Sequence, residues 1–342
     1  MKILVTGGLG FIGSHTVFSL IDKGYEPIII DNLSNTEIDT LRKLESLCEK
    51  KITFYHGDIR NTEFLESVFS ENQIEAILHF AALKSVNESI QIPIAYYENN
   101  ISGLISLMKV AKRNGVIKLI FSSSCTVYGQ SEEIPVTEQT PLKNAETPYG
   151  HTKFLGEEIL MSLSKVSSVQ IILLRYFNPI GAHPSGKIGE LPKGVPQNLV
   201  PFVTQTAIGL RDKLRIFGND YNTYDGTAVR DYIHVMDLAD AHVACIDYFE
   251  QNKDFQYEVF NVGTGKGVSV LELVKTFEKV NEIDLNFEFA ERRLGDIAEI
   301  FADTTKVNRV LGWKAKRGLE DALKDAWSWE LKLKNKNNIE NN

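Results

Sequence analysis

Residues 2–16, KILVTGGLGFIGSHT, place a group of glycines between an apolar run and a helical pattern. The run KILVT predicts a buried strand, and GSHTVFSLIDKG, residues 13–24, predicts the helix after it. Gly7, Gly10 and Gly13 lie in the turn, where glycine lets a pyrophosphate approach the backbone at a helix N-terminus. Glycine-rich turns are common, but a strand, glycines and a helix in this order predict the first unit of a dinucleotide-binding fold.

An acidic residue closes the second predicted strand. Asp31 ends PIIID, residues 27–31, and stands 18 positions after Gly13. A carboxylate there can accept hydrogen bonds from both hydroxyls of an adenine ribose and would repel a 2′-phosphate, so we expect NAD rather than NADP. Asp58, in HGDIR after the third predicted strand, is a second candidate for the adenine end. An ordinary turn aspartate is the alternative at both positions.

The alternation of strand and helix continues through the first half of the chain. Further strands are predicted at 52–56, 75–80, 118–124 and 169–177, and further helices around 37–50, 93–114 and from Pro148 onward. Strands that are almost wholly apolar and separated by helices are typical of a parallel sheet covered on both faces. The predicted fold class is α/β, a doubly wound parallel sheet (Rossmann-like) with a second, smaller α/β substrate domain.

The character of the sequence changes after Phe177. Loops rich in proline and glycine begin with NPIGAHPSGKIGELPKGVPQN, residues 178–198, and shorter elements follow. We place the NAD-binding domain at 1–177 and the substrate domain at 178–334, with a helix and a strand from about 231–262 returning to the first domain. Residues 335–342 are polar and nearly devoid of apolar side chains, so we expect them to be disordered.

The composition limits the classes of function. Of 342 residues, 37 are basic and 45 are acidic, which gives a net charge of −8. This balance offers no general attraction for nucleic acid or an anionic membrane, and we expect neither as a partner. The first apolar run is too short for a signal peptide, and no run approaches the roughly 18 residues of a spanning helix, which favours a cytoplasmic location.

Cysteines and histidines give no sign of a disulfide framework or a metal site. Cys48, Cys125 and Cys245 are odd in number and far apart, and no two of the 7 histidines are four residues apart. We therefore expect reduced cysteines that pack inside the fold, and no metal ion.

YGHTK, residues 149–153, contains a candidate acid/base pair. If a helix begins near Pro148, the spacing puts the Tyr149 hydroxyl and the Lys153 ammonium on one face. A free phenol has a pKa of about 10, but a fixed cation nearby favours the phenolate. For an arbitrary Tyr-x-x-x-Lys a solvated tyrosine and lysine are the usual explanation. The dinucleotide-binding pattern upstream favours the chemical one here.

Longer strings resemble a known family. TGGLGFIG, FSSSCTVYG and YGHTK together resemble the extended short-chain dehydrogenase/reductase superfamily. Within it, RYFNPIGAHPSG, IFGNDYNTYDGTAVRDYIHVMDLADAH and FNVGTGKGVSV look very like the UDP-glucose (UDP-galactose) 4-epimerases. The resemblance covers roughly residues 1–330 and is far more specific than the glycines alone.

The resemblance implies an activity and a cofactor. Such a protein inverts C4 of a UDP-hexose through a transient 4-keto sugar and NADH, with NAD tightly bound and regenerated in each turnover. It would be an isomerase (an epimerase) of carbohydrate and galactose metabolism with a UDP-sugar as substrate. Family members can be homodimers, so the predicted 93–114 helix and the Tyr149 helix are expected to pair with their copies.

The resemblance also implies roles for residues. Tyr149 would be base and then acid, Ser124 would pass it the sugar proton, and Lys153 would bind the nicotinamide ribose and lower the phenol pKa. The expected cofactor residues are Gly7, Gly10, Phe11, Ile12, Gly13, Asp31, Asn32, Asn35, Asp58, Ile59, Phe80, Ala81, Ala82, Lys84, Asn99, Tyr149, Lys153 and Tyr176. The expected substrate residues are Lys84, Ser124, Tyr149, Asn178, Asn198, Phe217, Arg230, Arg293, Asp296 and Ile300.

Among the substrate residues, Arg230 and Arg293 would hold the diphosphate as forked donors, Asp296 would meet the ribose and Phe217 would border the uracil. Without the family each arginine would be taken for a solvated side chain. Ile300, in GDIAEIFAD, stands where relatives that favour plain hexoses can carry tyrosine. We expect activity on UDP-glucose and UDP-galactose, and on UDP-GlcNAc and UDP-GalNAc through the extra space. The alternative is that Ile300 only packs the smaller domain.

Two other functions share parts of this pattern. An NAD-dependent sugar-nucleotide 4,6-dehydratase would keep the tyrosine and lysine but carry an acidic pair, where this chain has Ser124, Cys125 and Thr126. A non-catalytic dinucleotide-binding regulatory protein would be expected to lack Tyr149 or Lys153, and both are present.

Overall fold

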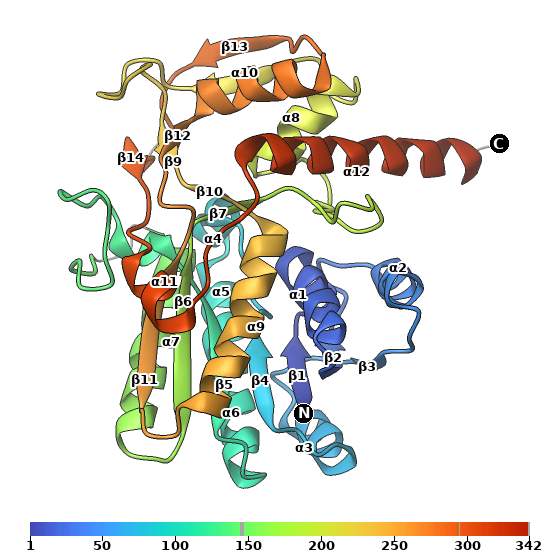
Figure 1. Ribbon diagram of the computed structural model, residues 1–342, viewed down its shortest axis with the longest axis vertical. Helices are drawn as coiled ribbons and strands as arrows, with labels where there is room; N and C mark the ends of the chain where they lie inside the picture. The colour runs from blue at the N-terminus through green and yellow to red at the C-terminus, as the bar shows by residue number, and fades with distance from the viewer. Residues whose placement is uncertain (144–146, 294, 341–342) are drawn as a thin grey trace.

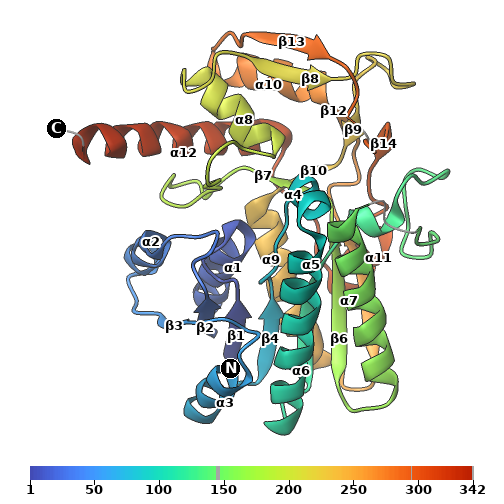
Figure 2. The same ribbon diagram turned by 180° about the vertical axis from the view of Figure 1, so that it is seen from behind.

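A seven-stranded parallel sheet forms the larger part of the computed structural model, which describes residues 1–143, 147–293 and 295–340 (Figures 1 and 2). In spatial order its strands are β11 (Tyr257–Val262), β6 (Gln170–Tyr176), β5 (Lys118–Ser124), β4 (Ala76–His79), β1 (Lys2–Thr6), β2 (Glu26–Asp31) and β3 (Thr53–His56). The order reverses between β1 and β4, which opens a crevice at their carboxyl ends. The predicted doubly wound α/β fold is confirmed.

Helices cover both faces of this sheet because its strands are apolar on both sides. In β1, Ile3 and Val5 belong to one buried cluster, and Leu4 between them belongs to the other. The first cluster is covered by α1 (Phe11–Asp22), α2 (Ile38–Cys48), α9 (Val235–Gln251) and α11 (Thr305–Leu311), and the second by α3 (Thr62–Glu71), α6 (Gly103–Arg113) and α7 (Pro148–Lys165).

Two elements of the large sheet come from late in the chain. β11 pairs with β6 in parallel register, from Tyr257 beside Ile171 to Val262 beside Tyr176. α9 packs along α1 on the face of the sheet seen in Figure 1. The chain therefore leaves the large sheet after β6, builds about half of the smaller part, returns through α9 and β11, and then builds the rest. The division of the domains at residue 177 stays a prediction.

The smaller part lies at the carboxyl edge of the large sheet (Figure 1). Its strands are β7 (Asn178–Ile180) with β10 (Tyr232–His234), β9 (Val229–Arg230) with β12 (Val268–Ser269) and β14 (Glu299–Ile300), and β8 (Leu214–Phe217) with β13 (Phe287–Ala290). Its helices are α8 (Leu199–Ala207), α10 (Val270–Asn281) and α12 (Leu319–Glu340), which share a third apolar core. This core is separate from the two on the large sheet.

The helix predicted over residues 93–114 is interrupted. After α4 (Val86–Gln91), the chain forms α5 (Pro93–Tyr97), a π-helical turn over Glu98–Ser102 and then α6. The wide turn carries Asn100, whose buried amide accepts from the Leu83 N–H at 2.8 Å and donates to Thr152 at 3.0 Å. One polar side chain thus ties the loop after β4 to α7, and the extra residue in the turn makes room for it.

The disorder expected for residues 335–342 stays a prediction, although helix α12 includes most of them. α12 continues to Glu340, and residues 341–342 lie outside the described part of the chain. Extending an existing helix adds one hydrogen bond for each residue ordered, so a polar segment can continue a packed helix without a core of its own. None of the helices in the described residues has the length and apolar character needed to cross a bilayer.

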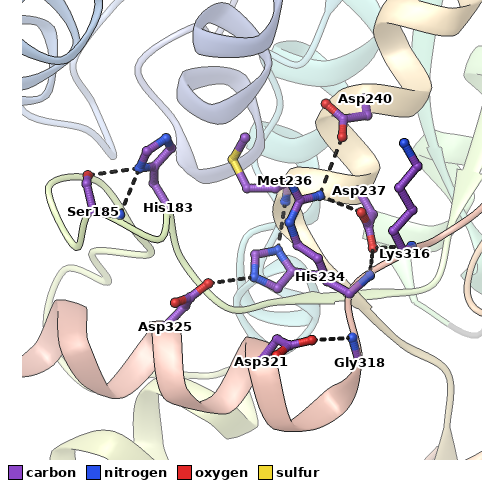
Figure 3. A network of polar contacts seen from close by, with 11 residues as sticks. His183, Ser185, His234, Met236, Asp237, Asp240, Lys316, Gly318, Asp321 and Asp325 are labelled. Carbon is purple, nitrogen blue, oxygen red and sulfur yellow. Dashed lines mark hydrogen bonds and ion pairs between the residues drawn. The ribbon is translucent and has the colours of Figure 1, made fainter.

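A polar network joins α9 of the large sheet to α12 of the smaller part (Figure 3). Asp237, in the first turn of α9, accepts from the Lys316 N–H at 2.9 Å, the Arg317 N–H at 2.8 Å and the Arg317 guanidinium at 2.5 Å. His234 caps the same helix by accepting from the Met236 N–H, and its Nε2 lies 3.1 Å from Asp325 of α12. The network fixes how the two parts sit against each other.

Replacing Asp237 with alanine is expected to destabilise the protein by about 2–4 kcal/mol, because two N–H groups and a guanidinium lose their acceptor. Asp240→Ala serves as the control, since Asp240 is half exposed and lies 3.4 Å from the same guanidinium. It should cost less than about 1 kcal/mol. Urea unfolding of the two variants measures the difference, and equal losses would contradict the assigned role of Asp237.

Candidate active site

The glycine turn after β1 leaves no space for side chains. Gly7 has a φ of +71°, and a Cβ there would lie 2.7 Å from the Ala81 nitrogen. A Cβ at Gly13 would lie 2.3 Å from the Gly7 carbonyl oxygen. Helix α1 then begins at Phe11 with no side-chain cap, so its first N–H groups are free to meet a negatively charged ligand. The backbone here has the form of a pyrophosphate cradle.

Asp31 connects this turn to the loop that follows β2. Its carboxylate accepts from the Leu9 N–H at 3.1 Å, the Leu33 N–H at 3.0 Å and the Thr36 hydroxyl at 2.7 Å. Asn32 and Asn35 belong to the same loop. Asp58, at the end of the next strand, is paired with Arg60 at 2.7 Å and accepts from the Asn32 amide at 3.4 Å. The Arg60 guanidinium lowers the pKa of the Asp58 carboxyl, which keeps this group ionised at the edge of the sheet.

Most of the other residues predicted for the cofactor lie near the same crevice, and Tyr176 is buried in the core. Phe80, Ala81 and Ala82 follow β4 beside the glycine turn, and Ile59 is buried against Gly103. Asn99 donates to Asn100 at 2.9 Å in the π-helical turn. Tyr176 is the exception, because its hydroxyl lies 2.5 Å from His242 Nε2 in the core, and burial raises its pKa well above the ordinary value.

Ser124, Tyr149 and Lys153 meet at the carboxyl end of β5. Helix α7 begins where the sequence predicts it, with the Thr147 hydroxyl accepting from the Gly150 N–H at 3.3 Å and Pro148 in the first turn. Tyr149 and Lys153 therefore share one face, and the Lys153 ammonium lies 5.9 Å from the centre of the Tyr149 ring. The ammonium also donates to the Ser122 carbonyl at 2.6 Å, which anchors it to β5.

Burial controls the protonation of this group. It raises the pKa of Tyr149 to about 12, although the hydrogen bond with the Ser124 side chain opposes the shift. It lowers the pKa of Lys153 to about 8, against the attraction of the Glu157 carboxylate. In the protein alone the phenol pKa is therefore not lowered, because burial is the largest influence on it. The lowering by Lys153 stays a prediction for the complex with cofactor and substrate.

Glu157 lies one turn beyond Lys153 and forms a buried ion pair with Arg175 of β6. The two oxygens of Glu157 accept from Arg175 Nε at 3.0 Å and Nη2 at 2.6 Å, and the Ser123 hydroxyl donates to the same carboxylate at 2.5 Å. Arg175 also donates to Tyr128 at 3.0 Å. The pair connects α7, β5 and β6 directly behind the three reactive side chains.

The residues predicted for the substrate form two groups across the crevice. In the first, Arg230 is paired with Asp296, and the Arg293 guanidinium lies 4.0 Å from the centre of the Phe217 ring. Ile300 is beside Arg230 in the β9–β14 ladder and is buried, with Tyr128 and Phe177 in the same apolar cluster. The structure thus brings these five residues together around one corner of the smaller part.

The second group includes a residue that the sequence analysis missed. Glu190 binds both Lys84, at 3.0 Å, and the Asn198 amide, at 2.6 Å. It lies in the long loop before α8, where no periodic pattern marked it. Asn178 begins β7, and its N–H donates to the Asp231 carbonyl at 2.9 Å. Glu190 thus links the segment after β4 to the residue that precedes α8.

Three further residues gain significance only from the fold. Asn100 and Glu157 are buried partners of the loops that carry the site, as described above. Thr126 Oγ1 is buried with no hydrogen-bond partner among the described residues, two positions after Ser124. The string SSSCT contained Thr126, but no sequence signal separated its hydroxyl from the others. No group of three or more histidine, cysteine or acidic side chains in the described ranges has the arrangement of a metal site.

Comparison with known proteins agrees with this geometry. A family model described as GDP-mannose 4,6 dehydratase matches residues 4–326. A Bacillus subtilis protein named UDP-glucose 4-epimerase is 51% identical over 331 residues, which cover 96% of this chain and 97% of that protein. The crystal structure of UDP-glucose-4-epimerase from Stenotrophomonas maltophila, with bound NAD and formylated UDP-arabinopyranose, has a TM-score of 0.96 at 43% identity and covers 98% of this chain and 99% of its own. The UDP-glucose 4-epimerase of Bifidobacterium longum, in complex with NAD+ and UDP, has a TM-score of 0.94 at 46% identity with the same coverage.

Proposed function

The chain belongs to the UDP-glucose 4-epimerase family of the extended short-chain dehydrogenases/reductases, and from this premise we propose that it is an NAD-dependent isomerase of UDP-hexoses. One feature supports this above all. Tyr149, Lys153 and Ser124 meet at the end of β5, two strands from the glycine turn of β1, in a sheet whose order reverses between β1 and β4. A sugar bound at β5 would then lie beside the nicotinamide end of a dinucleotide bound at β1.

The residues of the crevice fit NAD. The glycine turn offers backbone that side chains would block, and the open start of α1 suits the charge of a pyrophosphate. The Asp31 carboxylate suits an adenine ribose with both hydroxyls free, and it would repel the extra phosphate of NADP. The chemistry that NAD supplies when bound is reversible hydride transfer at C4 of the hexose, so that no net oxidation results.

The residues at the end of β5 handle the proton. The Tyr149 oxygen takes the proton from the sugar 4-hydroxyl and later returns it, with the Ser124 hydroxyl as its hydrogen-bond partner. Lys153, held by the Ser122 carbonyl, presents a positive charge that favours the phenolate. Because the pKa of Tyr149 is about 12 in the protein alone, mainly through burial, we expect this positive charge to favour the base only in the complex with cofactor and substrate.

The smaller part holds the nucleotide half of the substrate. Arg230 and Arg293 would grip the diphosphate, Phe217 would border the uracil, and Asp296 would accept from the ribose. Lys84, Asn178 and Asn198 would complete the substrate site. Inversion requires the hexose to turn over between the two hydride transfers. The protein would therefore bind the nucleotide half of the substrate tightly and make few contacts with the hexose half.

The description of the matching family model raises the dehydratase alternative. Elimination of water needs an acid and a base beside C5 and C6, and the positions after Ser124 hold a thiol and a hydroxyl, Cys125 and Thr126. Relatives that are 51%, 48% and 47% identical to this chain carry the epimerase name. Epimerisation is therefore favoured over dehydration. A product whose mass is lower than that of the substrate by one water would instead support the dehydratase.

We further propose that the protein is a homodimer that pairs through α4–α6 and α7. The exposed apolar residues of this face are Val86, Ile90, Ile92, Ile94 and Ile105. Ile94 is 80% exposed and Ile105 is 50% exposed, while α4 and α5 pack on α7 beside them. Such a strip on a monomer would face water, and a second copy would cover it. Light scattering should give twice the chain mass for the wild type and a lower mass for Ile94→Glu.

The cytoplasmic location inferred from the sequence is also kept as a proposal. Its support is the absence of a disulfide among the described cysteines Cys48, Cys125 and Cys245, which suits a reducing compartment. Cell fractionation with an antibody to the protein tests it directly.

Tyr149→Phe is expected to lower kcat by about 10²- to 10⁴-fold, because the proton acceptor is removed while the ring and its packing remain. A coupled assay of UDP-galactose conversion measures this. Tyr25→Phe, which removes an exposed hydroxyl bonded to Asp247, is the control and should retain activity. Equal activity of the Tyr149 variant and the wild type would eliminate the assigned base. A wild type that releases no nicotinamide nucleotide on denaturation would eliminate the cofactor cycle.

Ile300 is expected to permit both plain and N-acetylated sugars, and incubation with each of the four UDP-sugars tests this. Ile300→Ala should raise the ratio of kcat/KM for the N-acetylated pair to that for the plain pair by about tenfold, because the side chain then leaves more space at C2. Thermal unfolding controls for the weaker apolar packing around the smaller side chain. Complete exclusion of the N-acetylated pair by the wild type would refute the permissive assignment, and an unchanged ratio would leave Ile300 a packing residue.

A further inference from the structure

Residues 189–198, which we call the strap, cross from the smaller part to the carboxyl edge of the large sheet. In both ribbon views the loop after β7 runs between α12 and the end of α1 (Figures 1 and 2). Side chains of the strap bind the large sheet at two places. Lys193 reaches the loop after β2, and Glu190 and Gln197 reach the segment after β4. β2 and β4 flank β1, so the strap spans the glycine turn between them.

Lys193 makes the contact on the β2 side. Its ammonium donates to the Leu33 carbonyl at 3.1 Å and to the Ser34 carbonyl at 2.9 Å. Leu33 adopts a left-handed conformation, with a φ of +57°, which an ordinary side chain disfavours by about 1–2 kcal/mol. Its N–H donates to Asp31 while its carbonyl accepts from Lys193, so both sides of this residue are held. The strap therefore holds the loop that would surround the adenine ribose, through the contact of Lys193 with the Leu33 and Ser34 carbonyls.

The strap has a second contact on the β4 side. Glu190 pairs with Lys84 at 3.0 Å, and Gln197 accepts from the Asn87 amide at 3.1 Å. These contacts fix both ends of the strap beside the residues that follow β4, while Lys193 in its middle reaches the β2 side. A ligand lying across the end of β1 would therefore be covered by a strap that is attached to the large sheet on both sides of β1.

Trp329 of α12 supports the strap from above. Its indole N–H donates to the Glu190 carbonyl at 2.9 Å, and its ring lies so near Gly189 that a Cβ there would come within 2.6 Å. The Lys43 ammonium of α2 lies 4.8 Å from the centre of the same ring. Trp329 thus contacts both the strap and α2, so the start of the strap is held in place by packing against α12.

We propose that the strap retains the dinucleotide, with Lys193 as the residue that closes it over the adenosine end. This rests on the proposed function, in which NAD lies along the glycine turn with its adenine ribose at Asp31. A cofactor bound there can leave only after the contact between Lys193 and the Leu33–Ser34 carbonyls has opened. Lys193 is therefore a positioning residue for retention, and it acts through the loop after β2 without joining the chemistry.

The test measures nucleotide release from the purified protein. Lys193→Met keeps the aliphatic length and removes the donors, and it should release bound nicotinamide nucleotide roughly 3- to 10-fold faster, as expected for two hydrogen bonds from an exposed cation. The nucleotide that stays bound through prolonged dialysis is quantified after acid denaturation. Lys193→Arg, which keeps a cationic donor, should restore retention toward the wild-type rate.

Lys187→Met is the matched control, because Lys187 is an exposed lysine of the same loop whose ammonium makes no hydrogen bond within the described residues. It should retain nucleotide as the wild type does. Equal release from Lys193→Met and the wild type would overturn the proposal, as would equally fast release from Lys187→Met. Circular dichroism establishes that each variant is folded. A wild type without bound nucleotide would instead refute the proposed function, so the two failures are distinct.

Discussion

The ion pair between Glu157 and Arg175 is the constraint on which the rest of the site depends. Both side chains are buried, and two hydrogen bonds lock the guanidinium of β6 to the carboxylate of α7. Removing either partner would leave a charge inside the core, which typically costs about 3–5 kcal/mol. Helix α7 therefore cannot rotate or slide on β5 and β6 without breaking the pair. The relation of Tyr149 and Lys153 to Ser124 follows from that fixed helix.

Charged residues of the substrate side are already paired within the protein. Arg230 has Asp296, and Lys84 has Glu190, so under the proposed function a diphosphate that bound these side chains would exchange one ionic partner for another. The electrostatic part of the binding free energy is then the difference between the new ion pairs with the diphosphate and the internal ion pairs that are lost. This difference is smaller than either contribution alone. Such an exchange suits a cycle in which the sugar must loosen and turn without leaving.

Local patterns predicted the large sheet and its glycine turn because each strand, turn and helix start has its own sequence signal. KILVT and KLIFSSS form β1 and β5 with the predicted bounds, and α7 begins at Pro148. The position of Glu190 depends on how a long loop crosses the molecule, and the π-helical turn depends on a tertiary partner for Asn100. Such features arise from contacts between distant segments, which no local period encodes. The helical tail likewise depends on the packed start of α12.

β11 completes the large sheet, although it is separated from its neighbour β6 by about half of the smaller part and by α9. β6 ends at Tyr176 and β11 begins at Tyr257. On a translating ribosome the intervening segment takes on the order of ten seconds to emerge. Throughout that interval β6, buried along its whole length in the finished protein, has a bare edge that could pair with another nascent chain.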